Sequence, residues 1–255
     1  MEFGWDRLKL LRGDAEFLLD EIDDNTIDLI VTSPPYFNAK EYSQYKNVNE
    51  YMYKMDKIFT KVLNKLKESR MCAIVISPVI FPRKSRSHQS YRIPLPAYFT
   101  VMMERIGYEF LEDIVWVKPE GSAKNRNGTF FRSRKPVSYK PNIITESILV
   151  FKKKADFLID KVLKNDSLVV GDYERTNVWH ITPKTKSKHP APFPDELVAK
   201  LIKYYSYEGD MILDPFVGSG TTLKVSRELL RGCIGIEEEH LYCKMIEKEL
   251  NTKEL

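Results

Sequence analysis

The sequence predicts an α/β protein. Its 255 residues, 43% of them hydrophobic and 30% charged, have the composition of a globular chain that can bury a sizeable core. Short runs rich in Val, Ile and Leu alternate with segments whose apolar residues recur every three or four positions. The first pattern is typical of buried strands and the second of amphipathic helices, and their alternation indicates an α/β sheet.

The first part of the chain contains four predicted strands. They cover residues 28–32, 71–76, 110–117 and 147–151. Residues 51–66 are predicted to form a helix, because their apolar side chains share one helical face. A second helix is expected around residues 96–106.

The last part of the chain is predicted to be a strand–turn–helix–strand unit with a helix on either side. These elements are a helix at 194–205, a strand at 211–214, a turn at 215–220, a helix at 221–230, a strand at 233–236 and a helix at 240–250. Pro194 suits the first turn of its helix, since a proline there loses no hydrogen bond. An acidic residue, Glu237, stands at the end of the second strand.

Three scattered cysteines, Cys72, Cys233 and Cys243, do not form a disulfide framework, and no pair has zinc-ligand spacing. We therefore predict no metal site and a reducing, cytoplasmic compartment. The N-terminus lacks the apolar run of a signal peptide, and no segment approaches the ~20 apolar residues of a membrane span. No contact with a membrane is expected.

Positive charge is concentrated in two segments. Residues 81–92 carry a charge of +4 and residues 118–140 a charge of +6, although the whole chain carries only +4. Basic blocks on a near-neutral body are typical of proteins that bind a polyanion. Solvated loops would have the same composition, so charge alone leaves both interpretations open.

A glycine-rich motif follows the strand at 211–214. It reads Asp214-Pro215-Phe216-Val217-Gly218-Ser219-Gly220-Thr221-Thr222. Such a turn between a strand and a helix lets backbone amides approach a ligand closely, and Glu237 follows Gly220 at about the spacing at which an acid meets ribose hydroxyls. The motif lacks the Gly-Lys-Ser/Thr ending of a phosphate-binding loop. A ribose-containing cofactor is therefore predicted, with a purely structural turn as the alternative.

A second motif, Thr32-Ser33-Pro34-Pro35-Tyr36, directly follows the strand at 28–32. The two prolines stiffen the backbone and remove two amide donors, which leaves carbonyl groups available as acceptors. The Ser33 hydroxyl can also accept, and the Tyr36 ring offers a flat face for stacking. An exocyclic amine on a planar base would need such acceptors beside an aromatic ring. A proline-stiffened turn is the alternative.

Together the two motifs resemble the hallmark sequences of amino-methylating DNA methyltransferases that use S-adenosylmethionine. Four further segments resemble elements of the same family, at residues 12–15, 113–119, 146–152 and 189–194. The resemblance covers roughly residues 10 to 250, and the catalytic motif precedes the cofactor glycines. That order is the family's β arrangement.

The resemblance implies a Rossmann-like class I methyltransferase fold, with seven mostly parallel strands and helices on both faces. It also implies a single catalytic domain over residues 1–255. For S-adenosylmethionine it implies that Gly218, Ser219 and Gly220 pack on the methionine end, Glu237 binds the ribose and Asp14 the adenine amine. Phe216 and Phe193 would flank the cofactor. The other residues expected to contact it are Thr32, Asp214, Pro215, Thr221 and Thr222.

The family's substrate is a base flipped out of double-stranded DNA. The resemblance implies that Tyr36 stacks on this base while the Ser33 hydroxyl and the Pro34 carbonyl accept the hydrogen bonds of its amine. Pro35 completes the catalytic motif. A serine before the two prolines favours the N4 amine of cytosine, and an aspartate would favour the N6 amine of adenine. Carbon-5 methylation is disfavoured, because it requires a nucleophilic cysteine and all three cysteines fall inside predicted elements.

The basic segments are the predicted contacts with DNA, through Arg83, Lys84, Arg86, Lys124, Arg126, Arg132, Arg134 and Lys135. Candidate target-recognition elements are the loops 81–97 and 118–141 and the short segment 153–187. The family's usual setting, a restriction–modification system at the nucleoid with a cognate endonuclease, is left open by the sequence, as is a homodimer. Also open are an adenine target, an RNA substrate, an inactive DNA-binding or specificity subunit, and a nicotinamide-dependent oxidoreductase.

Overall fold

A mixed β-sheet forms the centre of the molecule. The computed structural model describes residues 7–37, 45–81, 85, 90–122, 141–155, 173–184 and 193–251. Within these ranges eight strands pair in the order β1-β10-β9-β2-β3-β7-β6-β8. Their bounds are Leu8–Arg12 (β1), Ile27–Thr32 (β2), Leu66–Ile76 (β3), Tyr108–Val117 (β6), Thr145–Lys153 (β7), Val178–His180 (β8), Met211–Asp214 (β9) and Gly232–Glu237 (β10). Strand β7 runs antiparallel to both of its neighbours, and every other pairing in this sheet is parallel.

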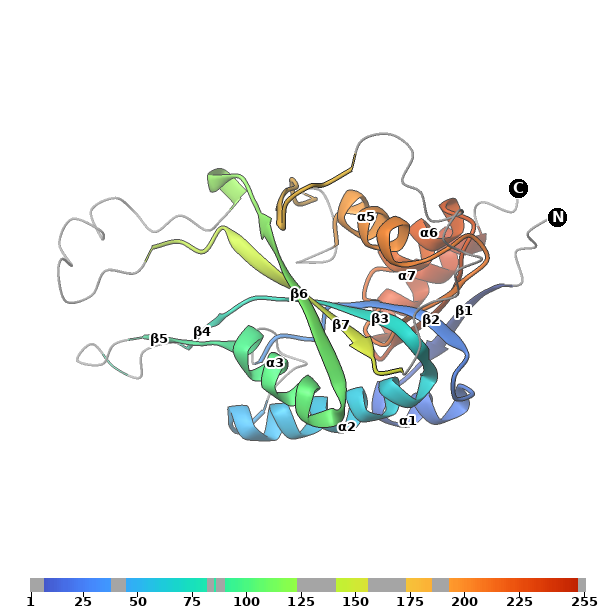
Figure 1. Ribbon diagram of the computed structural model, residues 1–255, viewed down its shortest axis with the longest axis horizontal. Helices are drawn as coiled ribbons and strands as arrows, with labels where there is room; N and C mark the ends of the chain where they lie inside the picture. The colour runs from blue at the N-terminus through green and yellow to red at the C-terminus, as the bar shows by residue number, and fades with distance from the viewer. Residues whose placement is uncertain are drawn as a thin grey trace.

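Helices cover both faces of the sheet (Figure 1). One face carries α1 (Ala15–Leu18), the short 3₁₀ turn η2 (Leu19–Glu21), α2 (Val48–Lys65) and α3 (Leu95–Ile106). The other face carries α5 (Asp195–Tyr205), α6 (Thr221–Glu228) and α7 (His240–Asn251). A further 3₁₀ turn, η3 (Glu120–Ser122), follows β6. Each face has its own hydrophobic core, as a sheet covered on both sides requires.

Local sequence signals account for the ends of helices α2 and α3. Asn47 caps the N-terminus of helix α2, because its side chain accepts a hydrogen bond from the backbone amide of Glu50. The apolar face of this helix is buried. Helix α3 ends at Gly107, which has φ +119°, a left-handed conformation that glycine adopts without strain. The packing of these apolar faces supplies most of their stability.

The predicted α/β fold with a mostly parallel sheet and helices on both faces is confirmed. The described residues contain eight strands, one more than the seven expected. The pattern of the sequence had not indicated β1 or β8. Strand β8 is only three residues long and is held by tertiary contacts, among them the bond from the Trp116 indole to the Ile181 carbonyl at 2.8 Å.

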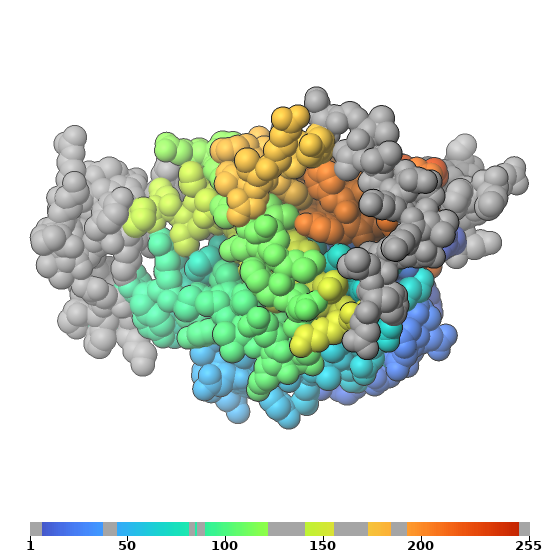
Figure 2. Space-filling view, viewed as in Figure 1, coloured from blue at the N-terminus to red at the C-terminus, as the bar shows by residue number. Residues whose placement is uncertain are grey.

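Strands β1, β10, β9, β2 and β3 are parallel, so their carboxyl ends lie along one edge of the sheet. A hairpin of β4 (Val79–Phe81) and β5 (Tyr91–Ile93) continues from the end of β3 and projects to the left in Figure 1. Strand β6 crosses the front of the molecule in Figures 1 and 2. In the part of the chain that the structure describes, no helix is both long and apolar enough to cross a membrane.

Candidate active site

Hydrogen bonds join the carboxyl ends of four neighbouring strands. The amide of Gly13, after β1, donates to the Glu237 carbonyl of β10 at 2.9 Å, and the amide of Val217, after β9, donates to the Ile236 carbonyl at 3.0 Å. The Thr32 hydroxyl at the end of β2 donates to the Asp214 carboxylate of β9 at 2.7 Å. Both chemical motifs of the sequence therefore meet at one edge, where open α/β sheets bind ligands.

Asp214 is the centre of this arrangement. One of its oxygens accepts from the Thr32 hydroxyl and from the amide of Phe216 at 3.1 Å, and the other from the Thr222 hydroxyl at 2.6 Å. The side chain is only 1% exposed, and burial raises the pKa of the carboxyl group from 3.8 to about 6, although the three hydrogen bonds oppose this shift. Asp214 thus ties the end of β2, where the Thr-Ser-Pro-Pro-Tyr motif begins, to both ends of the glycine turn.

Glu237 holds the glycine turn from the adjacent strand. Its two carboxylate oxygens accept from the amides of Gly218 and Glu239, each at 2.8 Å. Burial raises the pKa of Glu237, and these two amides partly offset the shift. Gly218 has φ +56°, so the turn depends on a residue that tolerates the left-handed region. The carboxylate keeps lone pairs for further hydrogen bonds, since each oxygen has two.

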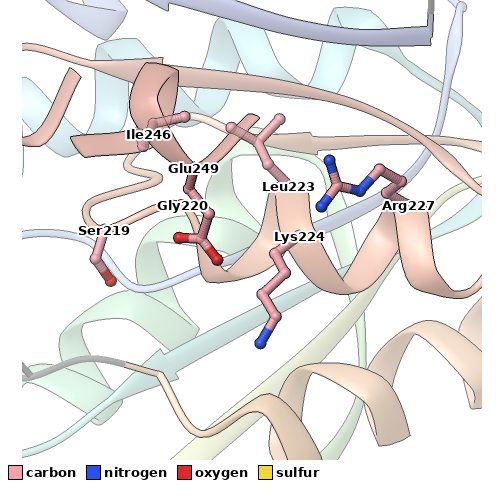
Figure 3. Close-up of a pocket in the computed structure, with 7 residues that line it drawn as sticks. All are labelled: Ser219, Gly220, Leu223, Lys224, Arg227, Ile246 and Glu249. Carbon is pink, nitrogen blue, oxygen red and sulfur yellow. The ribbon is translucent and has the colours of Figure 1, made fainter. Parts of the chain in front are cut away.

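Gly220 closes the turn against α7. Its φ is +84°, and a Cβ atom there would lie 2.8 Å from Cγ1 of Ile246. A small depression lies beside this contact, between α6 and α7, and is lined by Ser219, Gly220, Leu223, Lys224, Arg227, Ile246 and Glu249 (Figure 3). It encloses about 10 Å³, which is about the room that one water molecule needs, so it is far too small for a nucleoside cofactor.

Asp14 lies beside Glu237, because β1 pairs with β10 and places Arg12 opposite Glu237. One Asp14 oxygen caps α1 by accepting from the amide of Glu16 at 2.9 Å, and the other accepts from the Lys54 ammonium at 2.7 Å. Lys54 is not among the site residues expected from the sequence. No local signal identifies it, because it is one of several lysines on the surface of α2.

The Thr-Ser-Pro-Pro-Tyr motif is anchored through Tyr36. Its phenol donates to Oε2 of Glu146 on β7 at 2.8 Å, and Oε1 of Glu146 pairs with the ammonium of Lys118, which follows β6. Burial, with a further contribution from the Glu146 charge, raises the pKa of Tyr36 well above 10.0. The Ser33 hydroxyl, within hydrogen-bonding reach of the same phenol, opposes this shift. Glu146 and Lys118 lie in the segments 146–152 and 113–119 that resemble family elements, but neither residue was expected from the sequence to have a role in the site.

Aromatic packing holds the chain just after the motif. Phe37 is 2% exposed, and its ring contacts those of Tyr45, Tyr51 and Phe81 at centroid distances of 6.5, 6.0 and 6.5 Å. These rings come from α2, from the residues before it and from β4. The motif is therefore fixed on both sides, by β2 before it and by this cluster after it.

The predicted site residues divide into two groups by exposure. Buried members of the set are Thr32, Pro34, Asp214, Pro215, Gly220, Thr221 and Thr222. Partly exposed members are Asp14, Ser33, Pro35, Tyr36, Phe193, Phe216, Gly218, Ser219 and Glu237. The hydroxyls of Thr32 and Thr222 both donate to the Asp214 carboxylate, so these three residues support the turn. Their expected contacts with the cofactor stay a prediction. Phe193 packs against the core under α5 and α6.

The predicted DNA contacts lie outside the described residues. This applies to Arg83, Lys84, Arg86, Lys124, Arg126, Arg132, Arg134 and Lys135. It also applies to most of the candidate recognition segments 118–141 and 153–187, and to residues 82–84 and 86–89 of segment 81–97. Within the described ranges, Arg92 on β5 donates to the Pro141 carbonyl at 2.5 Å and so joins two of these segments.

The three cysteines are buried and free. Burial raises the pKa of Cys72, Cys233 and Cys243. A thiol without thiolate character is a poor nucleophile. This environment agrees with the expectation that none of them performs carbon-5 chemistry.

Comparison with known proteins places this geometry in a family. The model of the N6/N4 family described as DNA methylase matches residues 27–248. The type II beta methyltransferase M.BslI of Bacillus sp. strain NEB-606 is 32% identical over 242 residues, which cover 91% of this chain and 26% of that protein. M.BglII of Bacillus subtilis is 29% identical, with 92% of this chain and 66% of that protein covered. The chain thus spans about a quarter of the first relative and about two thirds of the second.

Solved structures share the fold. TTHA0409 of Thermus thermophilus, in complex with S-adenosyl-L-methionine, aligns with a TM-score of 0.76 at 23% identity, covering 96% of this chain and 94% of that one. The cytosine-N4-specific PvuII DNA methyltransferase aligns with a TM-score of 0.67 at 19% identity, covering 95% and 92%. The resemblance that the two motifs predict is confirmed, and the chain belongs to the N6/N4 DNA methylase family.

Proposed function

We propose that this protein transfers a methyl group from S-adenosylmethionine to the exocyclic N4 amine of a cytosine flipped out of double-stranded DNA. The observation that carries the proposal is the Thr32–Asp214 hydrogen bond at 2.7 Å. This bond joins the end of β2, which the Ser-Pro-Pro-Tyr motif follows, to the glycine turn after β9. It therefore places the rigid acceptors of the motif beside the turn that we assign to the cofactor. Family membership and the overlap with the TTHA0409 cofactor complex support the same cofactor.

The residues at the edge of β1, β10 and β9 suit this cofactor chemically. Two partly exposed carboxylates lie at the ends of neighbouring strands, Asp14 just after β1 and Glu237 at the end of β10. Both accept hydrogen bonds, and a nucleoside offers hydroxyl and amine donors. Gly218 and Ser219 allow close approach beside them, and Phe216 presents a partly exposed ring. In this assignment Thr32, Asp214 and Thr222 position the turn. When bound, S-adenosylmethionine supplies an electrophilic methyl group on a sulfonium.

The acceptors at the end of β2 carry the chemistry of the target base. The lone pair of an exocyclic amine is delocalised into the ring, so the nitrogen is a poor nucleophile. Two fixed acceptors, the Ser33 hydroxyl and the Pro34 carbonyl, would hold both N–H bonds and favour a pyramidal nitrogen whose lone pair is free to attack. Because the prolines stiffen these acceptors, alignment and preorganised electrostatics would supply most of the rate acceleration. The Tyr36 ring would stack on the base, worth ~1–3 kcal/mol by analogy with single strands.

Ser33 at the first position of the motif supports cytosine as the target, and the N4 specificity stated for the PvuII enzyme is consistent with it. The N6 amine of adenine is the second candidate, since the matching family includes both kinds of enzyme. A cognate endonuclease, as the type II names of the relatives suggest, belongs to the same proposal.

The test is methyl transfer from labelled S-adenosylmethionine to unmethylated, mixed-sequence duplex DNA, followed by mass spectrometry of the nucleosides. N4-methyldeoxycytidine is the expected product. N6-methyldeoxyadenosine would keep the site and mechanism but refute the base assignment. Transfer to RNA in place of DNA would refute the substrate. Failure to bind S-adenosylmethionine would refute the cofactor assignment altogether.

A further inference from the structure

Glu146 bonds to Tyr36 across the end of an intervening strand. The phenol of Tyr36 extends from the loop after β2, and Glu146 belongs to β7, on the other side of β3. The two residues are 110 positions apart in the chain. Nothing in the packing of β2, β3 and β7 requires this bond, because these strands pair through their own backbones.

The acceptor is itself held firmly. Glu146 and Lys118 have side chains only 14% and 21% exposed, and their ion pair uses the carboxylate oxygen that Tyr36 does not. Lys118 also lies over the Trp116 ring at 4.6 Å, and its backbone amide donates to the Ile144 carbonyl at 2.7 Å. Both oxygens of Glu146 thus have fixed partners, and low exposure strengthens these interactions.

The bond to Glu146 restrains the far end of the Tyr36 ring, which also packs against the core on the α2 side of the sheet. Two prolines already restrict the backbone before it, so its orientation depends on two side-chain torsions. A hydrogen bond at the far end of the phenol restricts both torsions. A ring that is ordered in advance avoids the entropy cost of ordering it when a ligand arrives.

We infer that Glu146, braced by Lys118, is a positioning residue that presets the Tyr36 ring to receive the flipped base. This inference rests on the proposed function, in which Tyr36 stacks on that base. Glu146 acts through the phenol and touches neither the cofactor nor the reacting amine. Its loss should impair capture of the base and leave cofactor binding unchanged.

A double-mutant cycle tests whether Glu146 acts through Tyr36. The variants are Tyr36→Phe, Glu146→Met and their combination, since Met approximates the length of Glu but has no strong acceptor. Glu146→Gln keeps one acceptor oxygen for the Tyr36 phenol, so this conservative variant should restore the function that Glu146→Met loses. The matched control is Glu109→Met, because Glu109 pairs with Lys152 at 2.8 Å between the same strands, β6 and β7, at their opposite ends.

The first readout needs no substrate. Proteins labelled with 3-fluorotyrosine give a fluorine NMR signal for Tyr36, which is assigned by its absence in Tyr36→Phe. Glu146→Met should shift this signal, and Glu109→Met should not. An unchanged Tyr36 signal in Glu146→Met would overturn the inference, whatever the activity of the enzyme.

The second readout is kcat/KM for mixed-sequence duplex DNA, with the affinity for S-adenosylmethionine measured beside it. Tyr36→Phe and Glu146→Met should each lower kcat/KM by roughly tenfold to a hundredfold, the size expected for a hydrogen bond to a charged group. The double variant should be no worse than either single variant, and Glu146→Gln should recover most of the loss. The inference would be overturned if the loss of kcat/KM in the double variant equalled the product of the two single losses. A collapse of the affinity for S-adenosylmethionine in Glu146→Met would also overturn it.

Two further outcomes remain decisive. If Glu146→Met does not fold, Lys118→Met takes its place in the cycle, because it releases Glu146 without removing the acceptor of the phenol. If the wild-type enzyme transfers no methyl group to any nucleic acid, the proposed function fails. The fluorine signal then still decides whether Glu146 orients Tyr36.

Discussion

Replacing Asp214 by asparagine tests whether burial or hydrogen bonding decides the charge of this carboxyl group. Burial raises its pKa to about 6, and hydrogen bonds from Thr222, Thr32 and Phe216 act in the opposite direction. An asparagine has the same shape and never ionises. Its oxygen can accept from Thr32 and Phe216, and the Thr222 hydroxyl can turn to accept from its amide.

The expected magnitude follows from linkage between ionisation and folding. In the unfolded chain the group titrates near 3.8, so as the pH rises the unfolded state loses this proton before the folded state does. The contribution of Asp214 to the stability of the wild-type protein therefore falls as the pH rises from 3.8 to about 6, and it falls no further above that range. At 1.36 kcal/mol for each unit of pKa, the loss between pH 4 and pH 8 is about 2–3 kcal/mol.

The assay is urea unfolding of both proteins at a series of pH values. The difference in unfolding free energy between Asp214→Asn and the wild type removes the contributions of all other titrating groups. This difference should move in favour of the variant by about 2–3 kcal/mol from pH 4 to pH 8. Asp195→Asn is the control, for which the difference in unfolding free energy should move in favour of the wild type as the pH rises. Burial raises the pKa of Asp195, but its ion pairs with Lys184 and Lys224 outweigh that effect and lower it overall.

Two results would refute the reasoning. A difference that does not vary with pH would mean that Asp214 titrates normally and that its burial has no electrostatic cost. A difference that moves in favour of the wild type as the pH rises would mean that the three hydrogen bonds outweigh desolvation. In that case the charged form is the one that the fold stabilises.

Three substitutions test the other parts of the site. Ser33→Ala should leave the affinity for S-adenosylmethionine unchanged by calorimetry and lower kcat at least about tenfold, and a collapse of affinity would make Ser33 structural. Glu237→Ala should weaken cofactor binding by roughly tenfold to a hundredfold, because it removes a charged acceptor, and an unchanged affinity would exclude the ribose assignment. Gly220→Ala should lower the unfolding free energy by about 2–4 kcal/mol, through its left-handed conformation and the contact with Ile246. Gly121→Ala, whose Cβ meets nothing within 4 Å, is the control that should remain near wild type, and equal losses would contradict the steric argument.

The elements of the sheet were largely predictable from local sequence. The strand expected at 211–214 is β9, and the strand expected at 233–236 lies within β10, which extends one residue further at each end. Helix α2 was expected at 51–66 and spans Val48–Lys65. It begins earlier than expected because its capping residue is Asn47, four positions before Tyr51, at which the expected helix begins. The three-residue strand β8 is too short to have a detectable period, so only its pairing with β6 identifies it.

The chemical assignment of the site also came from the sequence, because residue type and order along the chain carry it. Ser33, the two prolines and Tyr36 follow a buried run, and the glycine turn follows another, which together predict a ligand at the ends of strands. The family resemblance grouped Thr32, Asp214 and Thr222 with the cofactor contacts. Their burial could not be read from a motif, since it depends on what packs over the turn.

Only the tertiary structure decided how the parts hold one another. The Thr32–Asp214 bond joins residues 182 positions apart, the Tyr36–Glu146 bond residues 110 apart, and the Asp14–Lys54 pair residues 40 apart. Periodicity and turn chemistry act over a few residues, so they determine elements and local motifs. Which polar side chains meet depends on the order of strands in the sheet, because parallel strands distant in sequence bring their carboxyl ends to the same edge.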